Sequence, residues 1–259
     1  SGIGQQLAVL LAKQGCHLSL SDVNEQGLAQ TAALLTDSNV RVTTQKVNVA
    51  KLDEVRAWAQ DTVQNHGSVN MIFNNAGVAL GSTVEGASYE ELEWIVDINF
   101  WGVVYGTKEF LPLIKKSGEG HIINISSLFG LTAQPTQSAY NATKFAVRGF
   151  TESLRQELDM ENSGVSALCV HPGGIRTNIA NAAKMNDSLR SLGMNPEKSA
   201  QTFNKLLRCP PEEAARQILE AVQKDKRRLL IGNDAKALDL IQRILPTGYV
   251  PGDFVDGAP

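Results

Sequence analysis

The stretch SGIGQQLAVLLAKQGCHLSLSD, residues 1–22, decides the fold class. Apolar residues recur at helical spacing from Ile3 to Gln14, Gly15 ends that helix, and the short apolar run from Cys16 to Leu20 is typical of a buried strand. The same alternation of helix-period segments and short apolar runs continues along the chain. It predicts an α/β fold in which βαβ units wind into a mostly parallel sheet with helices on both faces.

The remaining elements follow from the same two periods. We expect further strands at residues 40–47, 69–73, 121–125, 165–170 and 228–231, and helices at 25–35, 52–65, 89–116, 138–162, 211–224 and 235–245. Residues 178–209 fall outside the alternation, and we interpret them as a lid, a common role of long insertions in α/β domains. The apolar stripe of helix 235–245 is expected to cover the core or a second subunit, with a membrane surface as the alternative.

The composition limits the function classes. With 259 residues, 42% of them hydrophobic and 20% charged, the chain is expected to fold as one domain over residues 1–259. The net charge of −3 gives no electrostatic reason for a nucleic-acid partner. No apolar run approaches the roughly 18 residues of a membrane span. Three scattered cysteines suggest neither disulfides nor a metal site, so we expect a cytoplasmic protein without a metal.

The sequence opens with Ser1, Gly2, Ile3 and Gly4 directly before a helix. Glycines at a helix N-terminus let backbone N–H groups and the positive end of the helix dipole approach a pyrophosphate. Asp22, after the next strand, can accept hydrogen bonds from an adenosine ribose but would repel a 2′-phosphate, which favours NAD over NADP. A second interpretation stays open for the glycines alone, in which they cap the helix or permit a close helix contact.

Tyr140 and Lys144 lie about one helical turn apart, on one face of a predicted helix. A free phenol has a pKa near 10, and a neighbouring cation, helped by a positively charged nicotinamide ring, would favour the phenolate. Such a pair is most often a solvated helix face. Here, however, Ser126 and Ser127 follow a predicted strand, and open α/β sheets bind ligands at the carboxyl ends of their strands. A serine hydroxyl there could hold a substrate oxygen beside Tyr140.

Four motifs follow one another along the chain: NNAG at 74–77, NISS at 124–127, YNATK at 140–144 and PGGIRT at 172–177. Together they resemble the ordered motifs of the short-chain dehydrogenase/reductase family, and the resemblance covers Ser1 to about Gly232. It implies a single-domain Rossmann-type fold with a doubly wound parallel sheet. It also implies hydride transfer between NAD(H) and a small-molecule alcohol or carbonyl compound, here a secondary alcohol or ketone.

The resemblance also implies catalytic roles for four residues. Ser127 would orient the substrate oxygen, Tyr140 would act as general acid/base, and Lys144 would bind the nicotinamide ribose and lower the pKa of the tyrosine. Asn99 matches an asparagine that holds a water in a proton relay to the lysine. The alternative for Asn99 is a polar residue that distorts its helix and is satisfied internally.

Cofactor contacts carry over from the resemblance in the same way. The implied cofactor-binding residues are Gly2, Ile3, Gly4, Asp22, Asn48, Val49, Asn75, Ala76, Gly77, Tyr140, Lys144, Pro172, Gly173, Ile175 and Thr177. Thr177 would offer a hydroxyl and Ile175 a backbone N–H to the nicotinamide amide. Asn48 stands where the family usually has an aspartate beside the adenine ring, and its carbonyl oxygen is expected to meet the adenine amino group.

The substrate pocket is expected beside Ser127, with Phe129, Gly174 and the segment 178–209 as its walls. Its apolar and methionine content favours a hydrophobic alcohol or ketone. By contrast, His121 and His171 lie in or beside strands, and we interpret each as a core or edge residue rather than as a catalyst.

The start of the chain departs from the family pattern. The family's glycine-rich fingerprint begins with Thr-Gly after a first strand, and neither precedes Ser1 in this sequence. From this departure we expect a fragment whose sheet lacks its central strand, and which alone folds poorly and binds NAD weakly because the flanking strands face unpaired backbone.

Two expectations concern the assembly and the class of function. The family's long helices commonly pair subunits, so a homodimer or homotetramer is expected through helices 91–116 and 142–162. The rival function is a non-catalytic nucleotide-binding or scaffolding protein on the same fold. Such a protein is expected to have lost one of the four catalytic residues, and all four are present.

Overall fold

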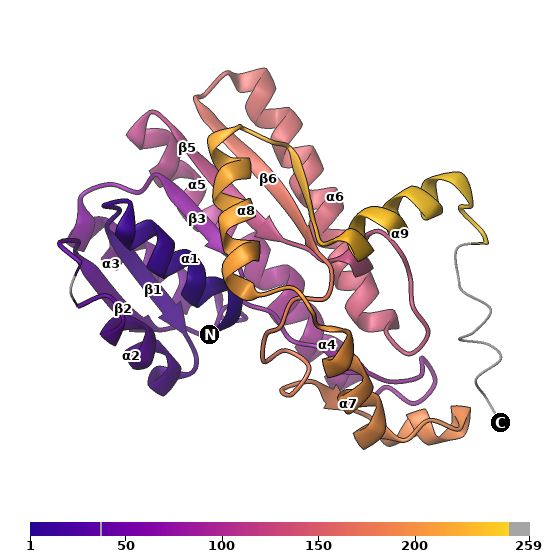
Figure 1. The fold of residues 1–259 in the computed structure, drawn as a ribbon. Coiled ribbons are helices and arrows are strands. Elements are labelled where there is room, and N and C mark those ends of the chain that lie inside the picture. Colours follow the sequence, from indigo (N-terminus) through magenta and orange to yellow (C-terminus); the bar gives the residue numbers. More distant parts are fainter. Residues whose placement is uncertain (37, 249–259) are drawn as a thin grey trace.

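The computed structural model describes residues 1–36 and 38–248, leaving aside the side chains of residues 200, 203 and 206. It is a single α/β domain with helices on both faces of parallel strands (Figure 1). The elements in chain order are α1 (Gly2–Lys13), β1 (Leu18–Asp22), α2 (Glu25–Ala33), β2 (Val42–Lys46), α3 (Leu52–His66), β3 (Met71–Asn74), β4 (Leu80–Gly81), α4 (Tyr89–Val96), the π-helical turn η1 (Asp97–Trp101), α5 (Gly102–Ser117), β5 (Gly120–Ile125), the short 3-10 helix η2 (Leu128–Gly130), α6 (Ser138–Glu161), β6 (Val165–Pro172), β7 (Lys184–Met185), the 3-10 helix η3 (Asp187–Leu192), α7 (Pro196–Leu206), α8 (Pro211–Gln223), β8 (Arg228–Ile231) and α9 (Asn233–Ile244).

The parallel strands form two main ladders. One has the order β3-β5-β6-β8, and the other pairs β1 with β2. Within the described part of the chain no ladder joins β1 to β3, although residues of both strands line one cavity. The backbone therefore offers two separate parallel ladders whose carboxyl ends meet at the same cavity. This arrangement agrees with the predicted Rossmann-type sheet interrupted beside β1.

The helices cover the two faces of the larger ladder with separate apolar clusters. On one face α1 and α8 pack against β5, β6 and β8, with Leu7, Ile218 and Val170 nearly or fully buried. On the other face α3, α5 and α6 pack against β3 and β5, around Phe110 and Ile122. Because parallel strands are buried on both faces, the middles of β5 and β6 are mostly apolar, as the sequence predicts.

Two expected segments contain elements that the sequence does not predict. The single helix expected at 89–116 is interrupted by η1, whose extra residue per turn shifts the helix phase between α4 and α5. The segment expected to be a lid, 178–209, contains β7, η3 and α7, and β7 forms a short parallel ladder with β4. Pairing between strands so far apart in sequence leaves no local signal that periodicity can detect.

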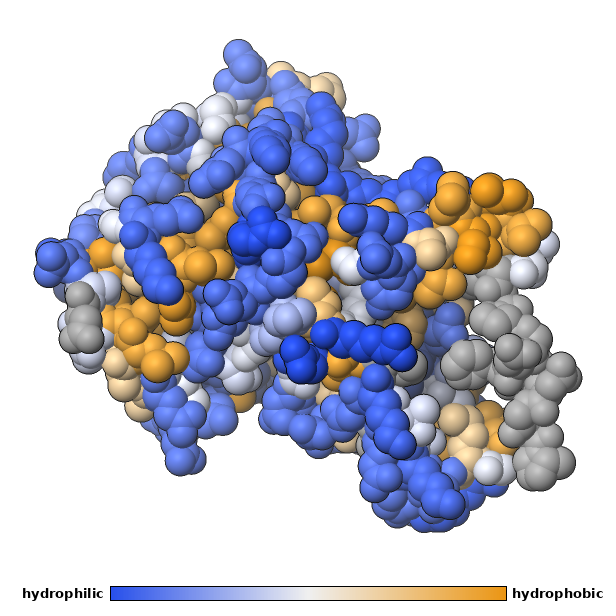
Figure 2. All heavy atoms as spheres, in the orientation of Figure 1, coloured by the Kyte–Doolittle hydropathy of each residue, from blue (hydrophilic) through white to orange (hydrophobic). Residues whose placement is uncertain are grey.

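The apolar stripe of α9 covers the core only in its first half, and its expected cover by a second subunit stays a prediction. Ala235 is buried, Leu238 lines the cavity and Asp239 is bonded to Arg228, while Leu240, Ile241, Ile244 and Leu245 are exposed. Figure 1 shows α9 projecting beside α6, and Figure 2 shows an apolar patch over that position. In the described part of the chain, no helix combines the length and the apolar character that crossing a bilayer requires.

Candidate active site

A cavity of about 1510 Å³ opens at the carboxyl ends of the strands and gathers most of the residues expected to bind cofactor and substrate. Its wall includes the start of α1, the turn after β3, the loop after β5, the first turns of α6 and the segment after β6. Open α/β sheets place their ligands at this edge. The cavity also continues between β1 and β3 to Trp58 and Phe110, which is deeper than a site at the strand ends requires.

The N-terminus of α1 faces this cavity without a side-chain cap or an acidic residue in its first turn. Gly2 has a φ of +57°, and a Cβ there would lie 3.0 Å from the Thr177 side chain. A Cβ on Gly4 would lie 2.9 Å from Asn75. The glycines therefore bring the helix start against two other expected cofactor segments, which supports the close-contact interpretation as well as the phosphate interpretation.

Tyr140 and Ser127 come together beside the cavity. Tyr140 lies in the first turn of α6 and is only 8% exposed, with its ring edge-on to Phe129. Ser127 precedes η2 and accepts a hydrogen bond of 3.1 Å from the Phe129 N–H at its Oγ. Burial raises the pKa of Tyr140, and a hydrogen bond with the Ser127 side chain lowers it. In the protein alone Tyr140 is thus a neutral phenol held next to a serine hydroxyl.

Lys144 lies one turn further along α6 and is 4% exposed. Its Nζ donates a hydrogen bond of 3.0 Å to the Ile125 carbonyl and lies 5.6 Å from the centroid of the Tyr140 ring. Burial lowers the pKa of Lys144 to about 8. In the protein alone burial penalises the charged form of both groups, and the lowering of the Tyr140 pKa by this lysine stays a prediction.

Asn99 is fully buried in the π-helical turn η1. Its Oδ1 accepts from the Val78 N–H at 2.8 Å, and its Nδ2 donates to the Val78 carbonyl at 2.9 Å and to Thr143 Oγ1 at 3.3 Å. The amide therefore ties η1 to the segment after β3 and to α6. This is the internally satisfied arrangement left open by the sequence, and a π-turn at a functional site is a recurrent feature.

The segment 172–177 folds back on itself at the end of β6. The Ile175 N–H donates to the Gly173 carbonyl at 2.9 Å, so the backbone donor expected for the nicotinamide amide is already engaged. Gly174, expected in the substrate pocket, donates its N–H to Asp234 Oδ2 at 2.7 Å. Sequence reasoning missed Asp234, and its place just after Gly232 at the start of a helix was the available signal. Asp234 also leaves no room for a Cβ at Gly173.

Two of the residues expected to bind the adenosine half of the cofactor already accept hydrogen bonds from the protein backbone. Asp22 is exposed at the end of β1, and its Oδ1 accepts from the Asn24 N–H at 2.9 Å. Asn48 Oδ1 accepts from the Ala50 N–H at 3.0 Å, so the carbonyl oxygen expected to meet adenine already serves a turn. Val49 packs against Gly102, where a Cβ would approach it to 2.8 Å. In the described residues no group of three or more His, Cys, Asp or Glu side chains could hold a metal.

Residues 1–188 match the sequence profile of the short chain dehydrogenases. The chain belongs to the short-chain dehydrogenase/reductase family. It is 45% identical over 250 residues to SadH, a Mycobacterium tuberculosis protein named as an oxidoreductase, and the match covers 96% of this chain and 89% of SadH. An uncharacterised Bacillus subtilis oxidoreductase, YxnA, is 32% identical over 95% of this chain and 67% of its own length.

Solved structures of this family have the same fold. A short-chain dehydrogenase/reductase from Burkholderia phymatum in complex with NAD gives a TM-score of 0.86 at 26% identity, covering 95% of this chain and 90% of that chain. Levodione reductase gives a TM-score of 0.77 at 27% identity, covering 92% and 95%. The protein is thus an oxidoreductase of the short-chain dehydrogenase/reductase family.

The buried ammonium of Lys144 is expected to destabilise the folded protein. Its pKa is about 8 in the folded chain and near 10.5 when exposed, so between these values the unfolded chain binds more protons and stability rises with pH. Below pH 8 the amine is charged in both states, so the full free-energy cost of burying the ammonium is present. Lys144→Met should therefore raise the free energy of unfolding at pH 7 by about 1–3 kcal/mol and flatten its rise between about pH 8 and 10.5. Urea unfolding across this pH range measures both effects.

Lys236→Met provides the control for this prediction, because Lys236 is an exposed lysine on α9. We expect it to leave the free energy of unfolding and its pH dependence unchanged. A lower stability of Lys144→Met than of the parent at pH 7 would contradict the argument.

Proposed function

We propose that this protein is an NAD-dependent dehydrogenase/reductase that interconverts a hydrophobic secondary alcohol and its ketone, with Tyr140 as general acid/base. The observation that carries the proposal is the buried Tyr140 phenol, which lies together with Ser127 at the wall of an otherwise largely apolar cavity. A proton donor fixed beside a hydroxyl at the carboxyl end of a strand is what reduction of a carbonyl needs.

The residues at the start of α1 fit a dinucleotide. The helix N-terminus has free N–H groups, no acidic neighbour in its first turn, and glycines that admit a close approach of the pyrophosphate. When bound, the nicotinamide supplies or accepts the hydride. We assign the adenine and ribose side to Asp22, Asn48, Val49, Asn75, Ala76 and Gly77, and the nicotinamide side to Pro172, Gly173, Ile175 and Thr177.

The chain's own part in the reaction is proton transfer and orientation. The Ser127 hydroxyl holds the substrate oxygen beside Tyr140, which donates the proton in reduction and accepts it in oxidation. Lys144 keeps two N–H donors beyond its bond to Ile125, and these serve the nicotinamide ribose. Asn99 supports the relay to Lys144 by holding η1 in place.

The substrate side of the cavity favours a hydrophobic compound. Phe129, Ile179, Leu207 and Leu238 line the cavity wall, and the segment 178–209 is assigned as a lid. The lid is fastened to the body by the β4–β7 ladder and by a hydrogen bond of 2.8 Å from Asn186 to Glu91. Levodione reductase has the same fold, and this likeness supports a carbonyl compound as substrate.

We also propose a cytoplasmic protein. Cys16, Cys169 and Cys209 are free thiols in the structure, as expected where thiols stay reduced. Burial raises the pKa of the Cys169 thiol to about 12, so that this cysteine serves as a small core residue.

Turnover of a panel of hydrophobic secondary alcohols and ketones with NAD(H) tests the proposed activity. Tyr140→Phe should lower kcat by at least about 10³-fold, while nucleotide binding measured by calorimetry stays within threefold. Because burial raises the pKa of Tyr140, carbonyl reduction in the parent should be fast at neutral pH and fall only at alkaline pH, whereas alcohol oxidation should rise with pH. Nucleotide binding without turnover of any member would favour the scaffolding alternative instead.

The cofactor preference depends on Asp22. Lys46 pairs with Asp22 across the β1–β2 ladder, but its ammonium is bonded to Glu25 at 3.0 Å and is not free for a 2′-phosphate. We therefore expect NAD to be preferred over NADP, and Asp22→Ser to shift the ratio of kcat/KM values toward NADP by at least about tenfold. Asp53→Ser, at an exposed acid on α3, is the control. A parent enzyme that prefers NADP would refute the assignment.

We further propose that the protein forms a homodimer or homotetramer through α5 and α6. Aromatic rings gather at the surface near η1: Trp101 is 42% exposed, stacks on Tyr105 and contacts Phe100, and Phe145 on α6 is 40% exposed. An exposed aromatic surface on two long helices is typical of a subunit contact.

Trp101→Lys tests this contact, because a charge in a desolvated aromatic interface should halve the mass seen by light scattering at micromolar protein. Ile244→Lys on α9 is the matched control in the other exposed apolar patch. If Ile244→Lys dissociates the protein and Trp101→Lys does not, the interface lies on α9.

A further inference from the structure

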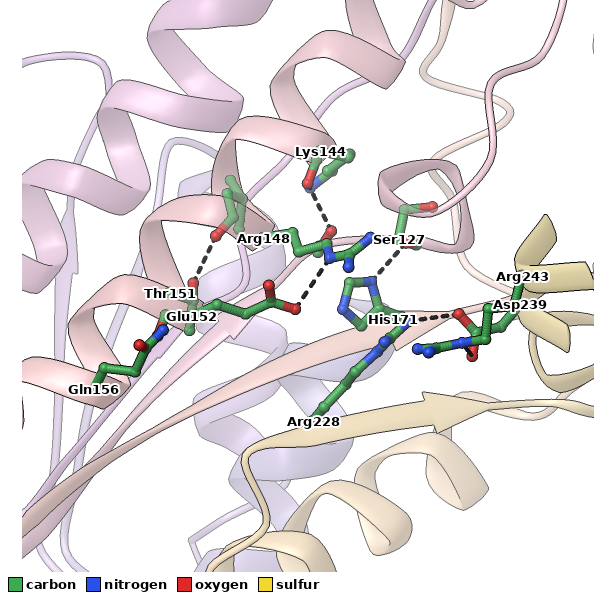
Figure 3. Close-up of polar contacts among 12 residues, drawn as sticks. Ser127, Lys144, Arg148, Thr151, Glu152, Gln156, His171, Arg228, Asp239 and Arg243 are labelled. Atoms are coloured by element: carbon green, nitrogen blue, oxygen red, sulfur yellow. Dashed lines mark hydrogen bonds and ion pairs between the residues drawn. The ribbon is translucent and has the colours of Figure 1, made fainter. Parts of the chain in front are cut away.

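His171 lies at the carboxyl end of β6 and is fully buried. Its Nδ1 is 2.9 Å from the backbone carbonyl oxygen of Ser127, the contact drawn in Figure 3. A carbonyl oxygen can only accept, so Nδ1 must carry the proton and donate it. The other ring nitrogen, Nε2, has no hydrogen-bond partner among the described residues. The imidazole is therefore held by one directed bond, and that bond goes to the residue assigned to the substrate oxygen.

This bond begins where the β5–β6 ladder stops. The last residue pair of the ladder is Ile125 with Val170, and the Ser126 N–H still donates to the Val170 carbonyl at 2.8 Å. Ser127 lies beyond it, and the His171 side chain makes the next link between the two strands in place of a backbone bond. The Ser127 carbonyl also accepts from the Gly130 N–H at 3.0 Å. Two donors thus fix the peptide unit that follows Ser127.

The surroundings of His171 keep it neutral. It faces α6, where Arg148 and Glu152 form an ion pair at 3.0 Å, and it neighbours Arg228 of β8 (Figure 3). Arg228 is bonded to Asp239 of α9 at 2.6 Å, and Arg243 shares that carboxylate. Burial lowers the pKa of His171 to about 4, and both arginines act in the same direction. At pH 7 the ring therefore has a single proton, and the bond to Ser127 assigns it to Nδ1.

We propose that His171 is a positioning residue for the reaction: by holding the Ser127 backbone carbonyl, it keeps the Ser127 hydroxyl beside the Tyr140 phenol at the cavity wall. The proposal deepens the proposed function and rests on it. It differs from the expectation that His171 simply fills the core, because it assigns the effect to one N–H group rather than to the volume of the ring.

A specific signature follows from the contact between Ser127 and Tyr140. The hydrogen bond from the serine side chain lowers the pKa of Tyr140, against the raising effect of burial. When the Ser127 carbonyl loses one of its two donors, the peptide after it can rotate and the hydroxyl can leave the phenol. The pKa of Tyr140 then rises further and kcat falls. The α1 and 172–177 contacts of the nucleotide are untouched, so nucleotide affinity stays the same.

Three substitutions of His171 separate the effect of its Nδ1–H donor from the effect of the ring volume. His171→Asn places an amide N–H near the position of Nδ1 and keeps the donor, whereas His171→Gln carries its amide one carbon further out. His171→Leu has nearly the shape of the asparagine variant and no donor. We expect His171→Leu and His171→Gln to lower kcat by about 10–100-fold and to move the alkaline limb of carbonyl reduction to higher pH. His171→Asn should stay within about threefold of the parent in kcat and keep its pH profile.

If His171→Asn and His171→Gln lower kcat equally, the proposal is overturned, since both side chains are amides and only asparagine keeps the donor at the Nδ1 position. Parent-like kcat in His171→Gln would overturn it as well. If His171→Leu does not fold, the comparison of kcat between His171→Asn and His171→Gln still tests the proposal. Nucleotide binding by calorimetry should remain within threefold in all folded variants.

A measurement independent of turnover separates this inference from the proposed function. ¹⁵N NMR of the imidazole in the full chain should show the proton on Nδ1 at pH 7 and no titration above pH 5. If the parent turns over no alcohol or ketone, the proposed function fails while this spectrum still tests the bond. A proton on Nε2 would overturn the inference whatever the activity.

Discussion

The docking of α6 on the end of β5 is the constraint on which the active site depends. Lys144 is bound there twice: its backbone carbonyl accepts from Ser126 Oγ at 2.8 Å, and its Nζ donates to the Ile125 carbonyl at 3.0 Å. A Cβ on Gly130 would lie 2.7 Å from the same lysine carbonyl, so only glycine permits this approach. Both bonds are buried, and α6 cannot slide or rotate without losing them. Tyr140, one turn earlier, is therefore fixed against the strand end.

A second buried row of polar groups joins the cofactor side of the sheet to the catalytic side. Asn74 of β3 donates to Asn124 Oδ1 of β5 at 2.8 Å, and Asn124 donates in turn to Thr151 Oγ1 of α6 at 3.0 Å. Buried amides are costly unless satisfied, and here one bond joins the two asparagines of a register pair while Thr107 and Thr151 accept from their amide N–H groups. A shift of one residue would turn them toward the opposite apolar face. The row thus helps to select the register that aligns both halves of the site.

The sequence predicts the local part of this structure well, because period and strand-end motifs are local signals. It identifies the parallel α/β fold and brings Ser127, Tyr140 and Lys144 to one cavity. It misses what depends on distant pairing: the β4–β7 ladder, and the bond from Gly174 to Asp234, which joins residues far apart in the chain. The π-turn agrees with the alternative that the sequence leaves open for Asn99, a polar residue that distorts its helix, and the bond to Val78 that holds it is not visible in the sequence.

The spacing of residues in the sequence predicts the pKa values of the site least well. Spacing places an ammonium beside a phenol, and in water that neighbour would favour the phenolate. In the folded chain the same burial that brings Tyr140 and Lys144 together raises the pKa of the phenol and lowers the pKa of the amine, so burial shifts both groups toward their neutral forms. A positive charge bound in this cavity acts through a low dielectric and shifts these pKa values more than it would in water. The proton affinity of Tyr140 is therefore coupled to the charge of what occupies the cavity, and Lys144 alone does not set it.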